Sequence, residues 1–116
     1  MLYKFFRART PRDFNDAKTL FLEYAQWLQV DLCFQEFDKE LADIAKIYDD
    51  PTGGIFLVQA GAEIVGCVGV KSLKTETKTD NTVCELKRMY VREGHRGYGF
   101  GKVFLELAEE LAIKLG

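Results

Sequence analysis

The fold is decided by a predicted strand and the glycine-rich turn that follows it: Cys84-Glu85-Leu86-Lys87-Arg88-Met89-Tyr90-Val91, then Arg92-Glu93-Gly94-His95-Arg96-Gly97-Tyr98-Gly99-Phe100-Gly101-Lys102. Glycine permits the positive φ values that aim successive N–H groups at one point, and its missing side chain lets a ligand approach the backbone. Because the turn opens a helix, free N–H groups and the helix dipole favour negative charge there. The stretch therefore predicts an anion site, and a phosphate suits it, with Arg96 and Lys102 adding positive charge.

Two common phosphate motifs do not fit this turn. A P-loop needs Ser or Thr directly after Gly-Lys to bind magnesium, and Gly101-Lys102 is followed by Val103. A dinucleotide fingerprint needs a third glycine where Lys102 stands. The remaining alternative is a connecting turn that binds nothing, but closely spaced glycines weaken a turn that only has to connect.

The pattern that fits is Arg-x-x-Gly-x-Gly, which Arg96, Gly99 and Gly101 satisfy between the strand and an amphipathic helix from Lys102 to Leu115. This arrangement resembles the acetyl-CoA-binding motif of the GNAT superfamily of N-acetyltransferases. The resemblance implies acetyl-CoA as co-substrate, and strand-like hydrogen bonds from the main chain of Met89, Tyr90 and Val91 to its pantetheine arm. It also implies that the pyrophosphate is held by the amides of Arg96, Gly97, Tyr98, Gly99, Phe100, Gly101 and Lys102.

Acetyl transfer to nitrogen requires a neutral amine, so an alkylammonium acceptor must first lose its proton. The resemblance implies a carboxylate on the strand as the base, and Glu85 is the only one there. Burial would be needed to raise the pKa of Glu85 towards neutrality. The alternative is that Glu85 only pairs with Lys87 or a cross-strand cation. The N–H of Met89 or Val91 could stabilise the oxyanion.

The rest of the chain predicts an α+β domain with the order β-α-α-β-β-β-α. The first helix starts at Pro11, with Thr10 as its N-cap and Asp13 in its first turn. Apolar residues at helical spacing continue this helix to Leu28, and Trp27 lies at the margin of the stripe, packing there or bordering a substrate cleft. The other elements, from their apolar patterns, are strands at Tyr3–Ala8, Ile55–Ala60, Glu63–Leu73 and Val83–Val91 and a short helix at Asp38–Tyr48. Together with the resemblance, these strands and helices imply a GNAT-like, mainly antiparallel sheet flanked by helices.

Three further features leave alternatives open. Gly66 and Gly69 on the predicted hairpin either keep a face open near the thioester or allow close packing or a bulge. The apolar segment Gln29–Phe37 either packs under the core or borders an acceptor with a hydrophobic part. Acidic residues at Asp31, Glu36 and Asp38 either attract a cationic amine or are solvated surface charges.

The composition of the chain limits the classes of partner that it can bind. The formal net charge is -2 and charges of both signs are interspersed, which argues against a general nucleic-acid binder. No apolar run is long enough to cross a membrane. Three cysteines without metal-ligand spacing indicate reduced thiols in a cytoplasmic protein and no metal site: Cys33, Cys67 and Cys84. We expect His95 to be a solvated loop residue.

We expect residues 1–116 to form one domain that is incomplete at its C-terminus, because the family pattern continues with further strands and a helix after Leu115. The strand Val83–Val91 would then be an open sheet edge, which favours pairing into a homodimer. The sequence predicts an N-acetyltransferase that acts on a small-molecule or peptide amine. The alternative is a non-catalytic acyl-CoA-binding or assembly module.

Overall fold

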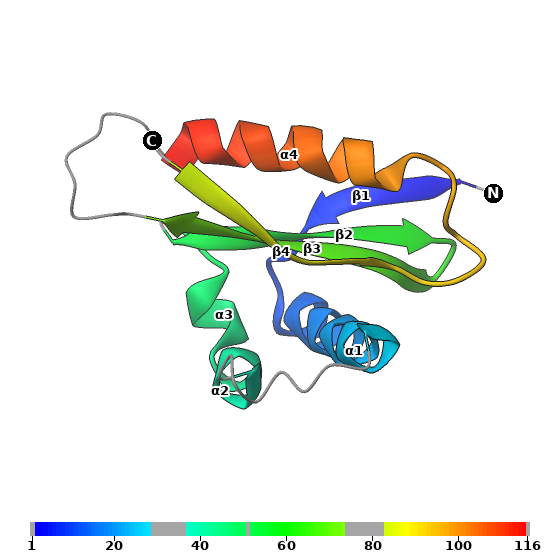
Figure 1. Cartoon of the computed structure of the whole chain (residues 1–116), viewed down its shortest axis with the longest axis horizontal. Helices are drawn as coiled ribbons and strands as arrows, with labels where there is room; N and C mark the ends of the chain where they lie inside the picture. The colour runs from blue at the N-terminus through cyan, green and yellow to red at the C-terminus, as the bar shows by residue number, and fades with distance from the viewer. Residues whose placement is uncertain (1, 29–36, 51, 74–82, 116) are drawn as a thin grey trace.

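A computed structural model describes residues 2–28, 37–50, 52–73 and 83–115. A four-stranded antiparallel sheet in the order β1-β2-β3-β4 lies between two helical layers. Figure 1 shows α4 on one face and α1, α2 and α3 on the other. The elements are β1 (Tyr3–Arg7), α1 (Pro11–Leu28), α2 (Phe37–Ala42), α3 (Ile44–Ile47), β2 (Gly53–Ala60), β3 (Glu63–Leu73), β4 (Val83–Val91) and α4 (Phe100–Leu115). The predicted fold class is confirmed.

The second predicted helix is divided in two, which the apolar pattern did not show. Asp43 ends α2 and caps α3, and its carbonyl accepts hydrogen bonds from Lys46 and Ile47 at 2.9 and 3.0 Å. The Asp43 side chain makes no capping hydrogen bond, so the break rests on these backbone contacts and on the low helix propensity of aspartate. The expectations for Gln29–Glu36 lie outside the described residues.

The start of α1 is as predicted. The amide of Asp13 donates to the Thr10 hydroxyl at 3.1 Å, and the Asp13 carboxylate accepts from the amides of Thr10 and Arg9 at 3.1 and 3.0 Å. This reciprocal capping satisfies N–H groups that the first turn would otherwise leave without partners. It fixes where the chain leaves β1 and turns onto the sheet.

Each face of the sheet has its own apolar core. The face under α1, α2 and α3 includes Phe14, Leu20, Phe21, Ile44, Tyr48 and Leu57. The face under α4 includes Val58, Val65, Val68, Val70, Phe104 and Leu111. The strand glycines serve this packing. A Cβ at Gly66 would lie 2.7 Å from Val58, and one at Gly69 would lie 2.8 Å from the Tyr48 ring. Close packing, not an open face, is therefore why glycine stands at both positions.

A β-bulge interrupts β4 near the C-terminal end of its pairing with β3. Cys67 pairs with Tyr90 and Gly69 pairs with Lys87, so Arg88 and Met89 together oppose one residue of β3. Arg88 has φ of 57°, the left-handed region that a non-glycine residue rarely adopts. The bulge points the Arg88 side chain at α2, towards Glu40.

The Arg88–Glu40 pair is almost completely buried. The guanidinium is held through two bonds, Nε to Oε2 at 3.2 Å and Nη2 to Oε1 at 2.9 Å, and the Tyr48 hydroxyl donates to the same carboxylate at 3.1 Å. Arg88 is 6% exposed and Glu40 8% exposed, so neither charge has water as a substitute partner. Burial lowers the pKa of Arg88, but the hydrogen bond and charge of Glu40 outweigh it, and the net pKa is raised. The pair ties α2 to the bulge.

Replacing Glu40 with Ala should therefore lower the free energy of unfolding by about 3 to 5 kcal/mol, because it leaves the Arg88 guanidinium buried without its carboxylate. Urea unfolding followed by circular dichroism measures the loss. Lys39→Ala, at the exposed neighbour on the same helix, is the control and should change little. The triple variant Glu40→Leu/Tyr48→Phe/Arg88→Met should recover most of the stability, since it removes both charges and the hydroxyl that donates to Glu40. Equal losses in Glu40→Ala and Lys39→Ala would show that the pair does not stabilise the fold.

Candidate functional site

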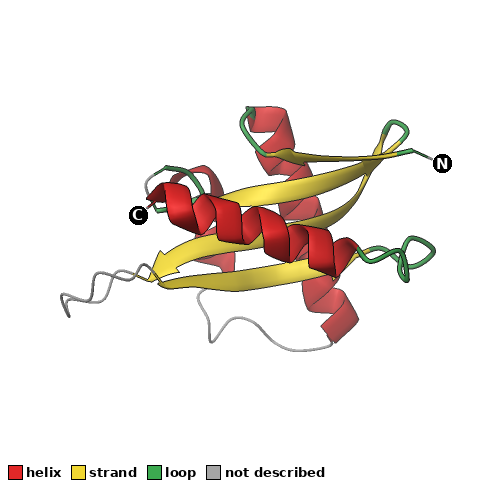
Figure 2. Ribbon diagram, turned by 90° about the horizontal axis from the view of Figure 1, so that it is seen from above, coloured by secondary structure: helices red, strands yellow, loops and turns green. Residues whose placement is uncertain are grey.

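The loop after β4 has the backbone that the glycines predicted. Gly94, Gly97 and Gly99 have φ of 92°, 87° and 78°, and a Cβ added at any of them would meet nothing within 4 Å. Gly101 already lies in α4. Figure 2 shows the loop beyond the N-terminal end of this helix. The glycines are thus required by conformation, and the space beside them is open to a ligand.

The amides of this loop are free to bind. Among the described residues, no main-chain N–H from Arg96 to Lys102 donates to a protein atom, and the next main-chain bond runs from Val103 N to Gly99 O at 3.4 Å. Several of these donors lie in the first turn of α4, where the helix dipole is positive. Free donors around an open glycine backbone suit an anion of several oxygens, such as a diphosphate.

Aromatic packing holds the loop against β1. Phe100 is buried, with its ring centroid 4.6 Å from that of Tyr3 and 5.3 Å from that of Phe5. Tyr98 is exposed and stacks on Phe100. Phe100 therefore faces the core and Tyr98 faces outwards. His95 differs from the prediction: it is half-buried, and its Nδ1 lies 3.1 Å from the Tyr3 hydroxyl.

The edge of β4 carries the peptide groups that the sequence assigned to the pantetheine arm. The amide of Arg92 donates to Val65 O at 2.8 Å, so the alternation of a strand directs the carbonyl of Val91 away from β3. β4 is the last strand of the described sheet, so this edge has no strand beside it there. Val91 thus directs its main-chain N–H and C=O to the open edge, whereas Met89 lies in the bulge and its part in binding stays a prediction.

The Arg96 side chain contacts the end of β4 and two aromatic rings. Its Nε donates to Val91 O at 2.6 Å, and its guanidinium lies 4.9 Å from the ring centroid of Trp27 and 5.7 Å from that of Tyr90. The guanidinium therefore lies at the open edge of β4. Trp27 packs at the margin of α1 against Tyr24 and Tyr90 and remains 54% exposed. The transfer of Arg96 onto phosphate oxygens stays a prediction.

A charged clamp at Arg92, which sequence reasoning missed, connects α1 to the start of the loop. The guanidinium donates to both oxygens of Glu23, at 2.9 and 2.6 Å, and to Glu63 at 2.6 Å. The Tyr90 hydroxyl also donates to Glu23, at 3.4 Å. The hydrogen bond and charge of Arg92 lower the pKa of Glu23 despite its partial burial. Nothing in local sequence indicates a contact between residues so far apart along the chain.

Glu85, the candidate base, lies on β4 in register with Lys71 and is exposed. The sequence led us to expect a buried carboxylate for the role of base, and Glu85 is not buried. In the part of the chain that the structure describes, it forms no ion pair with either Lys87 or Lys71 within 4.0 Å, so the structural alternative is not found there either. Its role stays a prediction.

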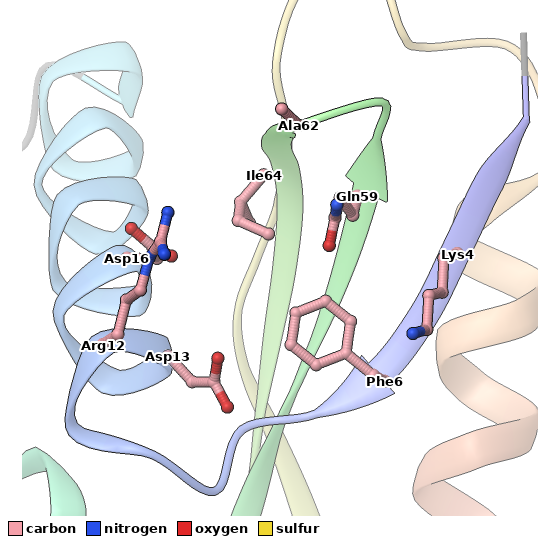
Figure 3. Close-up of a pocket in the computed structure, with 8 residues that line it drawn as sticks. All are labelled: Lys4, Phe6, Arg12, Asp13, Asp16, Gln59, Ala62 and Ile64. Atoms are coloured by element: carbon pink, nitrogen blue, oxygen red, sulfur yellow. The ribbon is translucent and has the colours of Figure 1, made fainter.

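Several cavities lie away from the loop. One of about 400 Å³ lies between α1 and the N-terminal half of the sheet (Figure 3), and its lining mixes both charges with apolar groups: Lys4, Phe6, Arg12, Asp13, Asp16, Gln59, Ala62 and Ile64. Another of about 260 Å³ includes Lys39, Tyr48, Lys71 and Lys87 in its lining. Over the described residues, no cluster of three His, Cys, Asp or Glu side chains could hold a metal, and no helix is long and apolar enough to cross a membrane.

Comparison with protein families matches residues 18–116 to the acetyltransferase (GNAT) family. An uncharacterised N-acetyltransferase of Schizosaccharomyces pombe is 36% identical over 110 residues, which cover 93% of this chain and 64% of that protein. The chain spans less than two thirds of the length of the curated relatives it matches.

Solved structures share the fold at low sequence identity. An aminoglycoside acetyltransferase from an uncultured soil metagenomic sample superposes with a TM-score of 0.76 at 16% identity, over 100% of this chain and 75% of that one. A predicted acetyltransferase of Clostridium acetobutylicum, solved with acetyl-CoA, superposes with a TM-score of 0.65 at 14% identity, over 97% of this chain and 75% of that one.

The Glu23–Arg92 contact should make stability depend on pH in the acid range. Because the pKa of folded Glu23 is lowered from its ordinary value of 4.5, its contribution is complete above about pH 4.5 and is lost as the pH falls through the folded pKa. Glu23→Gln should cost about 1 to 2 kcal/mol at pH 7, with the difference from the parent shrinking towards pH 3. Urea unfolding across this range measures it. Glu63→Gln, at the more exposed partner of Arg92, should show a smaller effect. A difference that does not change with pH would contradict the assignment.

Proposed function

The chain belongs to the acetyltransferase (GNAT) family, and on that basis we propose that it moves an acetyl group from acetyl-CoA to a primary amine of a small molecule or peptide by direct attack. The observation that carries the proposal is the set of free amides from Arg96 to Lys102 beside an open glycine backbone. Such donors at a helix N-terminus match the charge and shape of a diphosphate.

In this proposal the diphosphate of acetyl-CoA lies against the loop amides, and Lys102 adds a cation at the start of α4. The pantetheine arm runs along the open edge of β4 and pairs with the peptide groups of Met89 and Val91, as an added strand would. The Arg96 side chain leaves the Val91 carbonyl to make room. The thioester then lies beyond Met89, towards the bulge at Arg88.

The chemistry needs few side chains. Glu85 accepts a proton from the ammonium form of the acceptor, directly or through water, and the neutral nitrogen attacks the thioester carbonyl. The developing oxyanion is stabilised by a main-chain N–H of Met89 or Val91. The new C–N bond forms as the C–S bond breaks, and the CoA thiolate leaves. No residue of the described chain is assigned as the acid that protonates it.

A second candidate is a non-catalytic acyl-CoA-binding or assembly module. The observation that favours it is the exposure of Glu85, which leaves the base without the buried surroundings that the sequence led us to expect. In both cases we propose one domain over residues 1–116, without nucleic acid or metal, and a homodimer through the part of the β4 edge before the bulge, which leaves Met89 and Val91 to the pantetheine arm. Free thiols at Cys67 and Cys84 support a cytoplasmic location.

Gly99→Asp should weaken CoA binding by about 100-fold or more, because it adds a like charge and a strained side chain among the free amides. Isothermal titration calorimetry measures the affinity. Gly61→Asp is the matched control: Gly61 also has positive φ, of 61°, and open space beside it, but lies in the β2–β3 turn. Unchanged CoA affinity in Gly99→Asp would overturn the loop assignment.

Glu85→Gln should lower turnover at neutral pH by about 10- to 100-fold while leaving CoA affinity nearly unchanged, because it removes a proton acceptor and not a CoA contact. Acetyl transfer to a panel of amines across pH, together with calorimetry, separates the two effects. Glu106→Gln, at an exposed position of α4, is the control. Turnover equal to the parent at every pH would exclude Glu85 as the base.

A further inference from the structure

We propose that the rings of Tyr24, Trp27 and Tyr90 form an aromatic cage that binds a cationic group of the acceptor. The identity of the ligand as the acceptor rests on the proposed function, whereas the preference for an organic cation rests on the cage itself. The cage lies where the C-terminal half of α1 crosses the end of β4, beside the edge assigned to the pantetheine arm.

The three rings converge from two elements. Their centroids lie 6.4 Å apart for Tyr24 and Trp27, 6.3 Å for Tyr24 and Tyr90, and 5.9 Å for Trp27 and Tyr90. Tyr24 and Tyr90 are half-buried, and Trp27 is more than half exposed. A large aromatic ring left this accessible beside two others offers π-faces to a ligand from solution.

A cation already lies against these rings. The Arg96 guanidinium lies within 6 Å of the centroids of both Trp27 and Tyr90, the range in which a ring face attracts a positive charge. The protein's own guanidinium thus shows which chemistry the cage accepts. It acts as a stand-in for a ligand cation.

Arg96 is held in a way that lets it leave. Within the described ranges its side chain makes one hydrogen bond, to Val91 O, and that carbonyl lies on the edge assigned to the pantetheine arm. When the arm pairs with this edge, the bond is lost and the guanidinium can turn to the diphosphate. The cage is then open to another cation.

The charges near the cage agree with such a ligand. Glu23 accepts from the Tyr90 hydroxyl, and Arg92 pairs with this carboxylate. With Arg96 gone, Arg92 stays paired with both Glu23 and Glu63, so an incoming cation meets no unpaired positive charge. The attacking nitrogen itself must be neutral, so the group in the cage is a second, cationic group of the same acceptor. The acceptor class that follows is an amine that carries another cation, such as a diamine or a basic peptide.

The test uses Arg96→Ala and the single tryptophan of the chain, Trp27, whose fluorescence reports on the cage directly. Choline is the probe, and 3,3-dimethyl-1-butanol, which has the same shape without the charge, is its control. Arg96→Ala should show saturable quenching with choline, with at least tenfold weaker binding of the alcohol. The parent should bind choline several-fold more weakly than Arg96→Ala, because Arg96 competes. Equal binding of choline and the alcohol, or no binding to Arg96→Ala, would overturn the cage.

A second set of variants identifies the site. In the Arg96→Ala background, Tyr24→Phe keeps the ring and should retain choline binding, whereas Tyr24→Leu should lose most of it, with circular dichroism confirming that both fold. Choline binding that survives Tyr24→Leu would mean that the ligand lies elsewhere. These titrations contain no CoA, so they stand even if CoA binding and the proposed function fail.

A kinetic comparison connects the cage to the acceptor. Tyr24→Leu in the otherwise unchanged chain should raise KM for 1,4-diaminobutane about tenfold and leave KM for butylamine within twofold. Equal changes for the two amines would overturn the assignment of the caged group to the acceptor. Turnover of neither amine by the parent would count against the proposed function, and the choline titrations would still decide whether the cage exists.

Discussion

The rest of the site depends on one buried ion pair, between Arg88 of β4 and Glu40 of α2. The bulge that places Arg88 puts its backbone in the left-handed region, and such strain persists only where the surroundings hold it. Here two charged hydrogen bonds, the Tyr48 hydroxyl and the Phe37 ring do so. The bulge then determines the direction of the peptide groups in the last residues of β4, and therefore which of them reach the open edge.

Two further contacts continue from the bulge to the loop. Arg92 joins the end of β4 to α1 through Glu23, and Phe100 anchors the other end of the loop to β1. Between these anchors the chain makes few bonds of its own, so its amides stay available. An anion site of this kind needs fixed ends and a free middle, because donors satisfied within the protein could not bind a ligand. In the acetyl-CoA proposal, the two anchors hold the loop in place and the free amides between them bind the diphosphate.

The aromatic rings connect the two halves of the proposed reaction. Arg96 belongs to the phosphate loop by sequence, but its charge lies over Trp27 and Tyr90. One side chain can therefore respond to both ligands, to the diphosphate as a counter-ion and to an acceptor cation as a competitor. In this proposal, occupancy of the loop changes what the cage can bind without any movement of the sheet.

The strands, the first and last helices and the character of the loop could be predicted from the sequence, because these depend on local chemistry, whereas the break between α2 and α3 could not. Capping residues at Thr10 and Asp13 predicted a helix start, and the glycines at 97 and 99 predicted positive φ. Which distant charges meet depends on the fold. Glu40 reaches Arg88 and Glu23 reaches Arg92 because a bulge and a helix crossing bring them together, and no periodicity in the chain encodes either. For the same reason, only the fold could show that Arg96 turns to the rings of Trp27 and Tyr90.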